Sequence, residues 1–151
     1  MRIDDAEQTL IRVSFQRLKC RPEALSLDFY ERLFAAAPHL RRLFGEDMLR
    51  QAHKLSALLV HVVETCDRLE TLAGPLHDLG RFHAGKGVEG RHYAVVRAAL
   101  LDALEDNVTG WTAAHAAAWG RVYDIAATAM LHGAASGGIE GTDPAPRSAT
   151  A

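Results

Sequence analysis

The segment LAGPLHDLGRFH, residues 72–83, holds the most informative pattern in this chain. Its three leucines and the closing His83 recur at spacings of four, three and four residues, which places all of them on one face of a helix. The glycine-rich segment AGKG at residues 84–87 then interrupts the helix, and Val88 follows. The pattern predicts that His83 points its imidazole into the interior, where it needs a hydrogen-bonding partner or a metal. On this segment alone, an ordinary core histidine remains the favoured interpretation.

The composition is typical of one globular domain, and its charge gives no indication of binding to a polyanion. The chain has 151 residues, 48% of them hydrophobic, and a formal net charge of −2, so nucleic acid and membranes are not expected partners. Two cysteines are too few for a disulfide framework or a zinc cluster. The first residues do not resemble a signal peptide, and no apolar run reaches membrane-spanning length. We therefore expect a cytoplasmic protein.

Helix-forming residues dominate the chain, and no segment alternates with the two-residue period of a strand. The apolar periodicity, the potential caps and the prolines predict an all-α domain of six or seven helices over residues 1–132. Residues 133–151 are rich in Gly, Ala, Ser, Thr and Pro, and we expect them to form a disordered tail.

Three polar side chains lie where the helical pattern calls for apolar ones: Tyr30, Gln51 and His83. An unpaired amide, phenol or imidazole in the interior costs about 1–3 kcal/mol, so each of them needs a partner. Taken singly, Tyr30 fits a core tyrosine bonded to backbone or water, and Gln51 fits a half-exposed residue near a helix start. Taken together, they favour one interior cavity with a metal ligand on one wall and two hydrogen-bonding groups opposite.

Several segments resemble the globin family, and in particular bacterial single-domain haemoglobins. FYERLF at residues 29–34 and PHLRRLF at residues 38–44 resemble the B-helix tyrosine, the C-helix proline and the phenylalanine that packs against haem. QAHKL at residues 51–55 resembles the start of the distal E helix. LGRFHAGKGV at residues 79–88 is similar to the proximal segment of neuroglobin and of the Vitreoscilla and flavohaemoglobin group.

WGRVY at residues 119–123 resembles the tryptophan–tyrosine pair of the same group, and the order of all these segments extends the resemblance over residues 5–132. The resemblance implies a three-over-three globin fold around a haem b pocket, with His83 as the axial ligand of the iron. It also implies that Tyr30 and Gln51 form a distal pair beside the gas-binding position. The remaining pocket residues that it implies are Phe44, Leu55, Val88, Lys54 towards a haem propionate, and Tyr93 as the tyrosine that orients the proximal histidine.

The other histidines are interpreted as surface or propionate-side groups rather than iron ligands; they are His39, His53, His61, His77 and His92. One departure from the flavohaemoglobin pattern is informative. Those proteins carry a glutamate late in the last helix, whereas here no carboxylate follows Asp124 until Glu140. A strongly electron-donating, peroxidase-like proximal side is therefore not implied. Because Gln51 replaces a distal histidine, ligation by two histidines is not implied either.

The resemblance implies reversible binding of O₂, CO and NO, as in oxygen transport, by a monomer or weak homodimer. Two hydrogen bonds to bound O₂ would each contribute about 1–2 kcal/mol and slow its loss, which favours scavenging or sensing over bulk delivery. The alternative function is nitric oxide dioxygenation, an enzymatic activity that would depend on an external reductase because the chain contains no flavin- or nicotinamide-binding segment. A gas or redox sensor and a haem-free interaction module are further alternatives.

Overall fold

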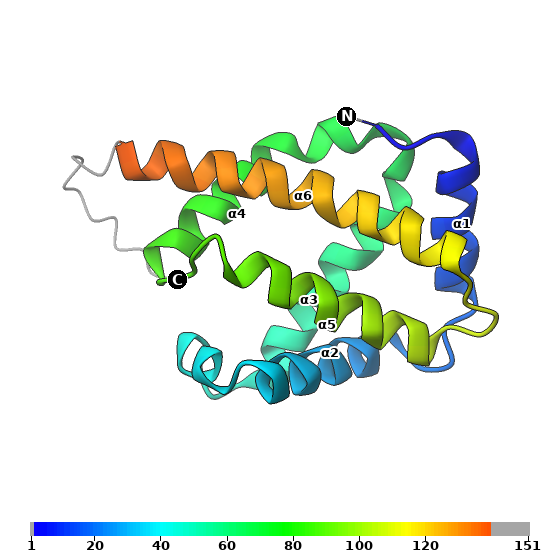
Figure 1. Cartoon of the computed structure of the whole chain (residues 1–151), viewed down its shortest axis with the longest axis horizontal. Coiled ribbons are helices and arrows are strands. Elements are labelled where there is room, and N and C mark those ends of the chain that lie inside the picture. The colour runs from blue at the N-terminus through cyan, green and yellow to red at the C-terminus, as the bar shows by residue number, and fades with distance from the viewer. Residues whose placement is uncertain (1, 140–151) are drawn as a thin grey trace.

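The computed structural model describes residues 2–139, and the regular structure among them is helical apart from one antiparallel bridge between Leu18 and Val108. In Figure 1, the long helix α6 crosses the face nearest the viewer, with α5 beside it and α3 behind in a different direction. Among these residues, no helix combines the length and apolar character needed to cross a bilayer. The predicted all-α class is confirmed. The elements, in chain order, are α1 (Asp5–Gln16), α2 (Pro22–Ala36), the 3₁₀ helix η1 (Pro38–Leu43), α3 (Met48–Glu64), the 3₁₀ helix η2 (Cys66–Leu72), α4 (Ala73–Gly85), α5 (His92–Asn107) and α6 (Ala113–Ile139).

Local chemistry explains where the first helices begin and end. Asp4 caps α1 through a reciprocal capping box, in which its carboxylate accepts from the Glu7 N–H and the Glu7 carboxylate accepts from the Asp4 N–H, both at 2.8 Å. Pro22 occupies the first turn of α2, where its missing N–H costs nothing. Ala37 takes an extended φ of −143° before Pro38, because a residue preceding proline avoids the helical region. These signals lie within four residues of the ends that they determine.

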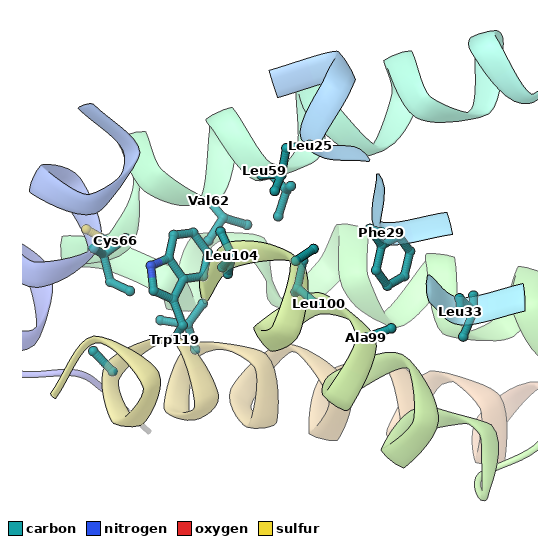
Figure 2. Packing of buried hydrophobic residues seen from close by; sticks show 14 of the residues in the cluster. Leu25, Phe29, Leu33, Leu59, Val62, Cys66, Ala99, Leu100, Leu104 and Trp119 are labelled. Carbon is teal, nitrogen blue, oxygen red and sulfur yellow. The ribbon is translucent and has the colours of Figure 1, made fainter. Parts of the chain in front are cut away.

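The core joins helices that are far apart in sequence. Figure 2 shows the indole of Trp119 among core residues of neighbouring helices, including Val62 and Leu104. The Trp119 Nε1–H donates to the Ser14 Oγ at 2.8 Å, and both residues are fully buried. This bond ties α6 to α1 and satisfies the indole donor inside an apolar core.

Helices α4 and α6 make the largest interhelical contact, and two glycines allow it. A Cβ added to Gly80 would lie 1.8 Å from the Met130 carbonyl oxygen, and one added to Gly133 would lie 1.8 Å from the His77 carbonyl oxygen. The two backbones are therefore in direct contact, and no side chain larger than hydrogen fits between them. This contact sets the position of the helix that carries His83.

The boundary expected at residue 132 is wrong, because α6 continues to Ile139. Gly133 is buried against α4, so at least this part of the expected tail belongs to the packed domain. The sequence pattern missed the extension because its anchor is a glycine, which has no apolar side chain to register in a hydrophobic period. Residues 140–151, the rest of the expected tail, lie outside the described residues.

We expect Gly80→Ala and Gly133→Ala each to lower the free energy of unfolding by about 2 kcal/mol or more, because the added methyl group forces the two backbones apart. Gly74→Ala is the matched control in the same helix, since nothing lies within 4 Å of its added Cβ. That change is expected to be neutral or to stabilise by about 0.5–1 kcal/mol. Urea unfolding of the three variants measures the difference; equal effects at the three glycines would contradict the close contact.

Candidate functional site

Tyr30 and Gln51 meet across the α2–α3 contact. Tyr30 is 6% exposed, and the Gln51 Nε2–H donates to its phenol oxygen at 3.4 Å. Burial raises the pKa of Tyr30, and the hydrogen bond from Gln51 opposes this only in part. The phenol therefore stays protonated at neutral pH. Because Gln51 donates to the oxygen, the phenol proton remains available to a third group.

Three aromatic rings lie close to the Tyr30 ring. Phe29 and Phe44 pack edge to face with it at centroid distances of 4.9 and 5.4 Å. Phe34 lies parallel to it at 6.0 Å, and Phe34 and Phe44 pack edge to face at 5.3 Å. Phe44 follows η1, so the 3₁₀ corner brings it back onto the helix that precedes it. We call Tyr30, Phe34, Phe44 and Gln51 the distal cluster.

His83 lies near the end of α4, half-buried, and only its backbone is hydrogen-bonded. Its carbonyl oxygen accepts from the Lys86 and Val88 N–H groups at 3.0 Å, while neither ring nitrogen has a hydrogen-bonding partner within residues 2–139. Desolvation lowers the pKa of the imidazole below its usual value. The ring is therefore neutral at neutral pH, which is the form that binds metals.

The loop after His83 returns to the corner that carries Phe44. Gly87 has a φ of +102°, a conformation that favours glycine, and its Cβ position would lie 3.5 Å from Leu43 Cδ2. Leu43 immediately precedes Phe44, so this turn packs against the Leu43 side chain next to the distal cluster. Val88 ends the turn half-buried.

The remaining predicted residues are less closely tied to these groups. Leu55 is half-buried on α3 and Lys54 is exposed. Tyr93 is half-buried, and its carbonyl oxygen accepts from the Tyr123 hydroxyl at 2.9 Å. No hydrogen bond joins the Tyr93 hydroxyl to His83 among the described residues, so the orienting role of Tyr93 remains a prediction.

His92 is 6% exposed, so the surface position that was one of the two expected for it is wrong, while a place on the propionate side stays a prediction. Its Nδ1 accepts from the Glu89 N–H at 2.9 Å, so the ring helps to terminate the turn before α5. Its Nε2 is buried without a hydrogen-bonding partner among the described residues. The sequence signal for this role is the spacing: His92 lies three residues after Glu89, as glutamate or glutamine lies three residues after the residue that it bonds in a capping box. His39, His53 and His61 are exposed as expected, and His77 is half-buried.

We expect His92 to make the protein less stable in acid. Desolvation, with a further contribution from Arg91, lowers the pKa of His92 in the folded protein, so the unfolded chain takes up a proton more readily as the pH falls below about 6.5. Stability contributed by the neutral ring is thus lost in that range. His92→Gln keeps an acceptor for the Glu89 N–H but does not titrate, and should show a smaller loss of stability between pH 7 and 5. If the urea midpoints of the wild-type protein and of His92→Gln fell equally between pH 7 and 5, this role would be contradicted.

The fold and these groups define a class of protein: a helical domain with a buried tyrosine bonded to a glutamine and, on another helix, a neutral histidine whose ring has no hydrogen-bonding partner among the described residues. The family model described as Globin matches residues 27–130. The chain belongs to the globin family.

Relatives and solved structures agree with this assignment. The chain is 30% identical to neuroglobin-1 of Oncorhynchus mykiss, over 94% of this chain and 99% of that protein. It is 28% identical to an anaerobic nitrite reductase of Oryza sativa subsp. indica, over 86% and 94%. An engineered carbene transferase from Rhodothermus marinus, made from a candidate nitric oxide dioxygenase, superposes with a TM-score of 0.81 at 28% identity, over 93% of this chain and 99% of that chain. The globin fold predicted above is therefore confirmed.

Globins imply haem, and the donor set fits that group. His83 offers a neutral imidazole whose ring nitrogens are unpartnered within the described residues, as an axial ligand requires. The distal cluster offers apolar ring surface from Phe44 and a protonated phenol. Arg41 also contacts the distal cluster, through the Phe34 ring, and the sequence analysis did not identify it. Its sequence signal is that of a cationic residue in the last turn of η1.

Proposed function

We propose that this globin holds haem b through His83 and binds O₂, together with CO and NO, on the side of Tyr30 and Gln51. The observation that carries the proposal is the buried Tyr30–Gln51 hydrogen bond at 3.4 Å, which leaves the phenol proton unused. Haem iron, when bound, supplies one position for a neutral imidazole and another for a diatomic ligand. The chain supplies the imidazole, the apolar walls and the polar pair.

The polar pair distinguishes among gases by hydrogen bonding. The raised pKa of Tyr30 keeps its hydroxyl a donor, and Gln51 holds the phenol oxygen from the opposite direction. Dioxygen held by haem iron would carry partial negative charge on its outer atom, whereas CO would be a weak acceptor. A donor here therefore stabilises O₂ more than CO, by about 1–2 kcal/mol for each bond to a partly charged acceptor.

Nitric oxide dioxygenation is the second candidate. It is favoured by the match to the Rhodothermus marinus protein over nearly the whole of both chains. The same distal pair serves both functions, and the described residues contain one helical domain without a second domain for flavin. We propose that any such activity in this chain draws its electrons from a separate reductase, and that the chain acts in the cytoplasm.

The experiment that tests the function is a set of absorption spectra followed by a turnover count. Purified protein should take up one haem, and after reduction it should bind O₂ and CO reversibly. Failure to retain haem, or immediate oxidation by O₂, would contradict the binding function. The O₂-bound protein should then convert one equivalent of NO to nitrate and stop, with cycling restored by NADH and an added reductase. Many turnovers with NADH alone would show that the chain is an enzyme by itself.

A further inference from the structure

Arg41 is the polar residue with the most varied contacts at the distal cluster. It lies in η1, half-buried, and its guanidinium carbon is 5.6 Å from the centroid of the Phe34 ring. Its Nη1–H donates to the Gly45 carbonyl oxygen at 2.9 Å and to the Phe44 carbonyl oxygen at 3.4 Å. One side chain thus contacts both a ring of α2 and the backbone that carries Phe44.

The two residues that Arg41 contacts are the ring neighbours of Tyr30. Phe34 packs against Phe44 at 5.3 Å, and the two rings lie 6.0 and 5.4 Å from the phenol. The contacts of Arg41 are with Phe34, Phe44 and Gly45 rather than with Tyr30 itself, so its influence on the phenol passes through these rings. Arg42, the next residue in the chain, has different surroundings. Arg42 is exposed and donates to the His39 carbonyl oxygen at 3.3 Å, within its own helix.

The backbone after η1 needs such a tether. Phe44 is the C-cap of η1 and Gly45 follows it, so their carbonyl groups lie beyond the hydrogen bonding of the helix, and the Arg41 guanidinium donates to both of them. Phe44 reaches Tyr30 only if this segment stays folded back onto α2. The Arg41 guanidinium lies over the Phe34 ring and donates two hydrogen bonds to the backbone after η1, and these contacts hold that backbone against α2.

We propose that Arg41 is a positioning residue for the distal tyrosine: it clamps the Phe44 segment onto Phe34 and thereby holds the Tyr30 phenol in one orientation. The proposal deepens the proposed function, on which it rests, because a phenol in one orientation donates to a distal ligand more effectively than a mobile one. Arg41 does not itself contact the ligand.

The test compares Arg41→Ala with Arg42→Ala in the haem-loaded protein. Loss of the clamp should speed O₂ dissociation by about three- to tenfold, as expected for removing one cation–π contact and one net hydrogen bond. The Arg42 variant should stay within about twofold, because its single bond is local. Arg41→Gln retains a donor for the carbonyl oxygens without the charge over Phe34, and its rate should fall between these values. It also serves as the test variant if Arg41→Ala folds poorly.

A measurement that does not involve O₂ distinguishes positioning of the Tyr30 ring from a general loosening of the fold. The chain has three tyrosines, so a CO-bound sample with isotope-labelled tyrosine rings gives few signals, and Tyr30→Phe assigns one of them. We expect Arg41→Ala to broaden or split the Tyr30 signal and leave those of Tyr93 and Tyr123 unchanged. Arg41→Ala combined with Tyr30→Phe should release O₂ at the rate of Tyr30→Phe alone, because the arginine acts through the phenol.

The outcomes separate the two proposals. An unchanged Tyr30 signal, or additive effects of the Arg41 and Tyr30 changes on O₂ release, would overturn the positioning role. Tyr30→Phe without effect on O₂ release would overturn the distal role of the phenol, while the ring signal would still decide whether Arg41 positions it.

Discussion

His83→Ala should abolish stable haem binding, the largest effect that we expect from any single change. Removing the imidazole takes away the protein ligand to iron, and even the outer-shell partners of metal ligands contribute 10–100-fold, so haem retention should weaken by more than about a hundredfold. Haem content after gel filtration and the intensity of the Soret band measure the loss. His77→Ala, on the same helix and half-buried, is the matched control and should retain haem.

A second variant separates ligation from packing. His83→Gly leaves space for an added imidazole, and free imidazole should restore haem retention and the spectrum if His83 acts as a ligand. A variant that keeps one haem with an unchanged iron–imidazole stretch would show that another residue holds the iron. A variant that fails to regain haem with imidazole but unfolds cooperatively would assign His83 a packing role.

Tyr30→Phe and Gln51→Leu should each speed O₂ dissociation by about five- to thirtyfold, which corresponds to one hydrogen bond of about 1–2 kcal/mol. Their 3.4 Å contact predicts coupling, so the double variant should differ from the sum of the single changes. Stopped-flow release of O₂ and of CO, measured side by side, tests both points. CO release should change less, because CO accepts hydrogen bonds weakly.

Tyr123→Phe is the control for the loss of a phenol hydroxyl outside the distal cluster. Its hydroxyl donates to the Tyr93 carbonyl oxygen, outside the distal cluster, so its removal should leave O₂ release nearly unchanged. Equal acceleration of O₂ and CO release in Tyr30→Phe or Gln51→Leu would identify the pair as a steric gate. Strictly additive rates would contradict their coupling.

Periodicity and turn chemistry predicted most of the fold. The capping carboxylate of Asp4, the prolines that begin α2 and η1, and the glycine break after His83 all act within a few residues of the structure that they determine. Such signals survive in any tertiary context because backbone sterics and local hydrogen bonds do not depend on distant partners. The same reasoning placed Tyr30 and Gln51 on inward-facing positions and favoured one shared cavity for them; their role as a distal pair came from the globin resemblance.

Other features could be recognised only from the tertiary structure. Gly133 carries no apolar side chain, so only the contact between the α4 and α6 backbones shows that α6 extends past residue 132. His92 looked like a surface residue because its burial depends on the turn before α5, to which its ring is bonded. No sequence pattern distinguishes Arg41 from Arg42 beside it, and only the fold places the Arg41 guanidinium against the Phe34 ring.

The amino-acid sequence by itself determined the helices, most of their ends and the inward direction of Tyr30 and Gln51, because 3.6-residue periodicity and capping are local properties of the chain. Tertiary structure alone decided which of these residues meet. The Tyr30–Gln51 bond spans 21 residues, and the tie between α6 and α1 spans 105. Such contacts depend on how helices cross, which the combined packing of all side chains decides and no local pattern encodes.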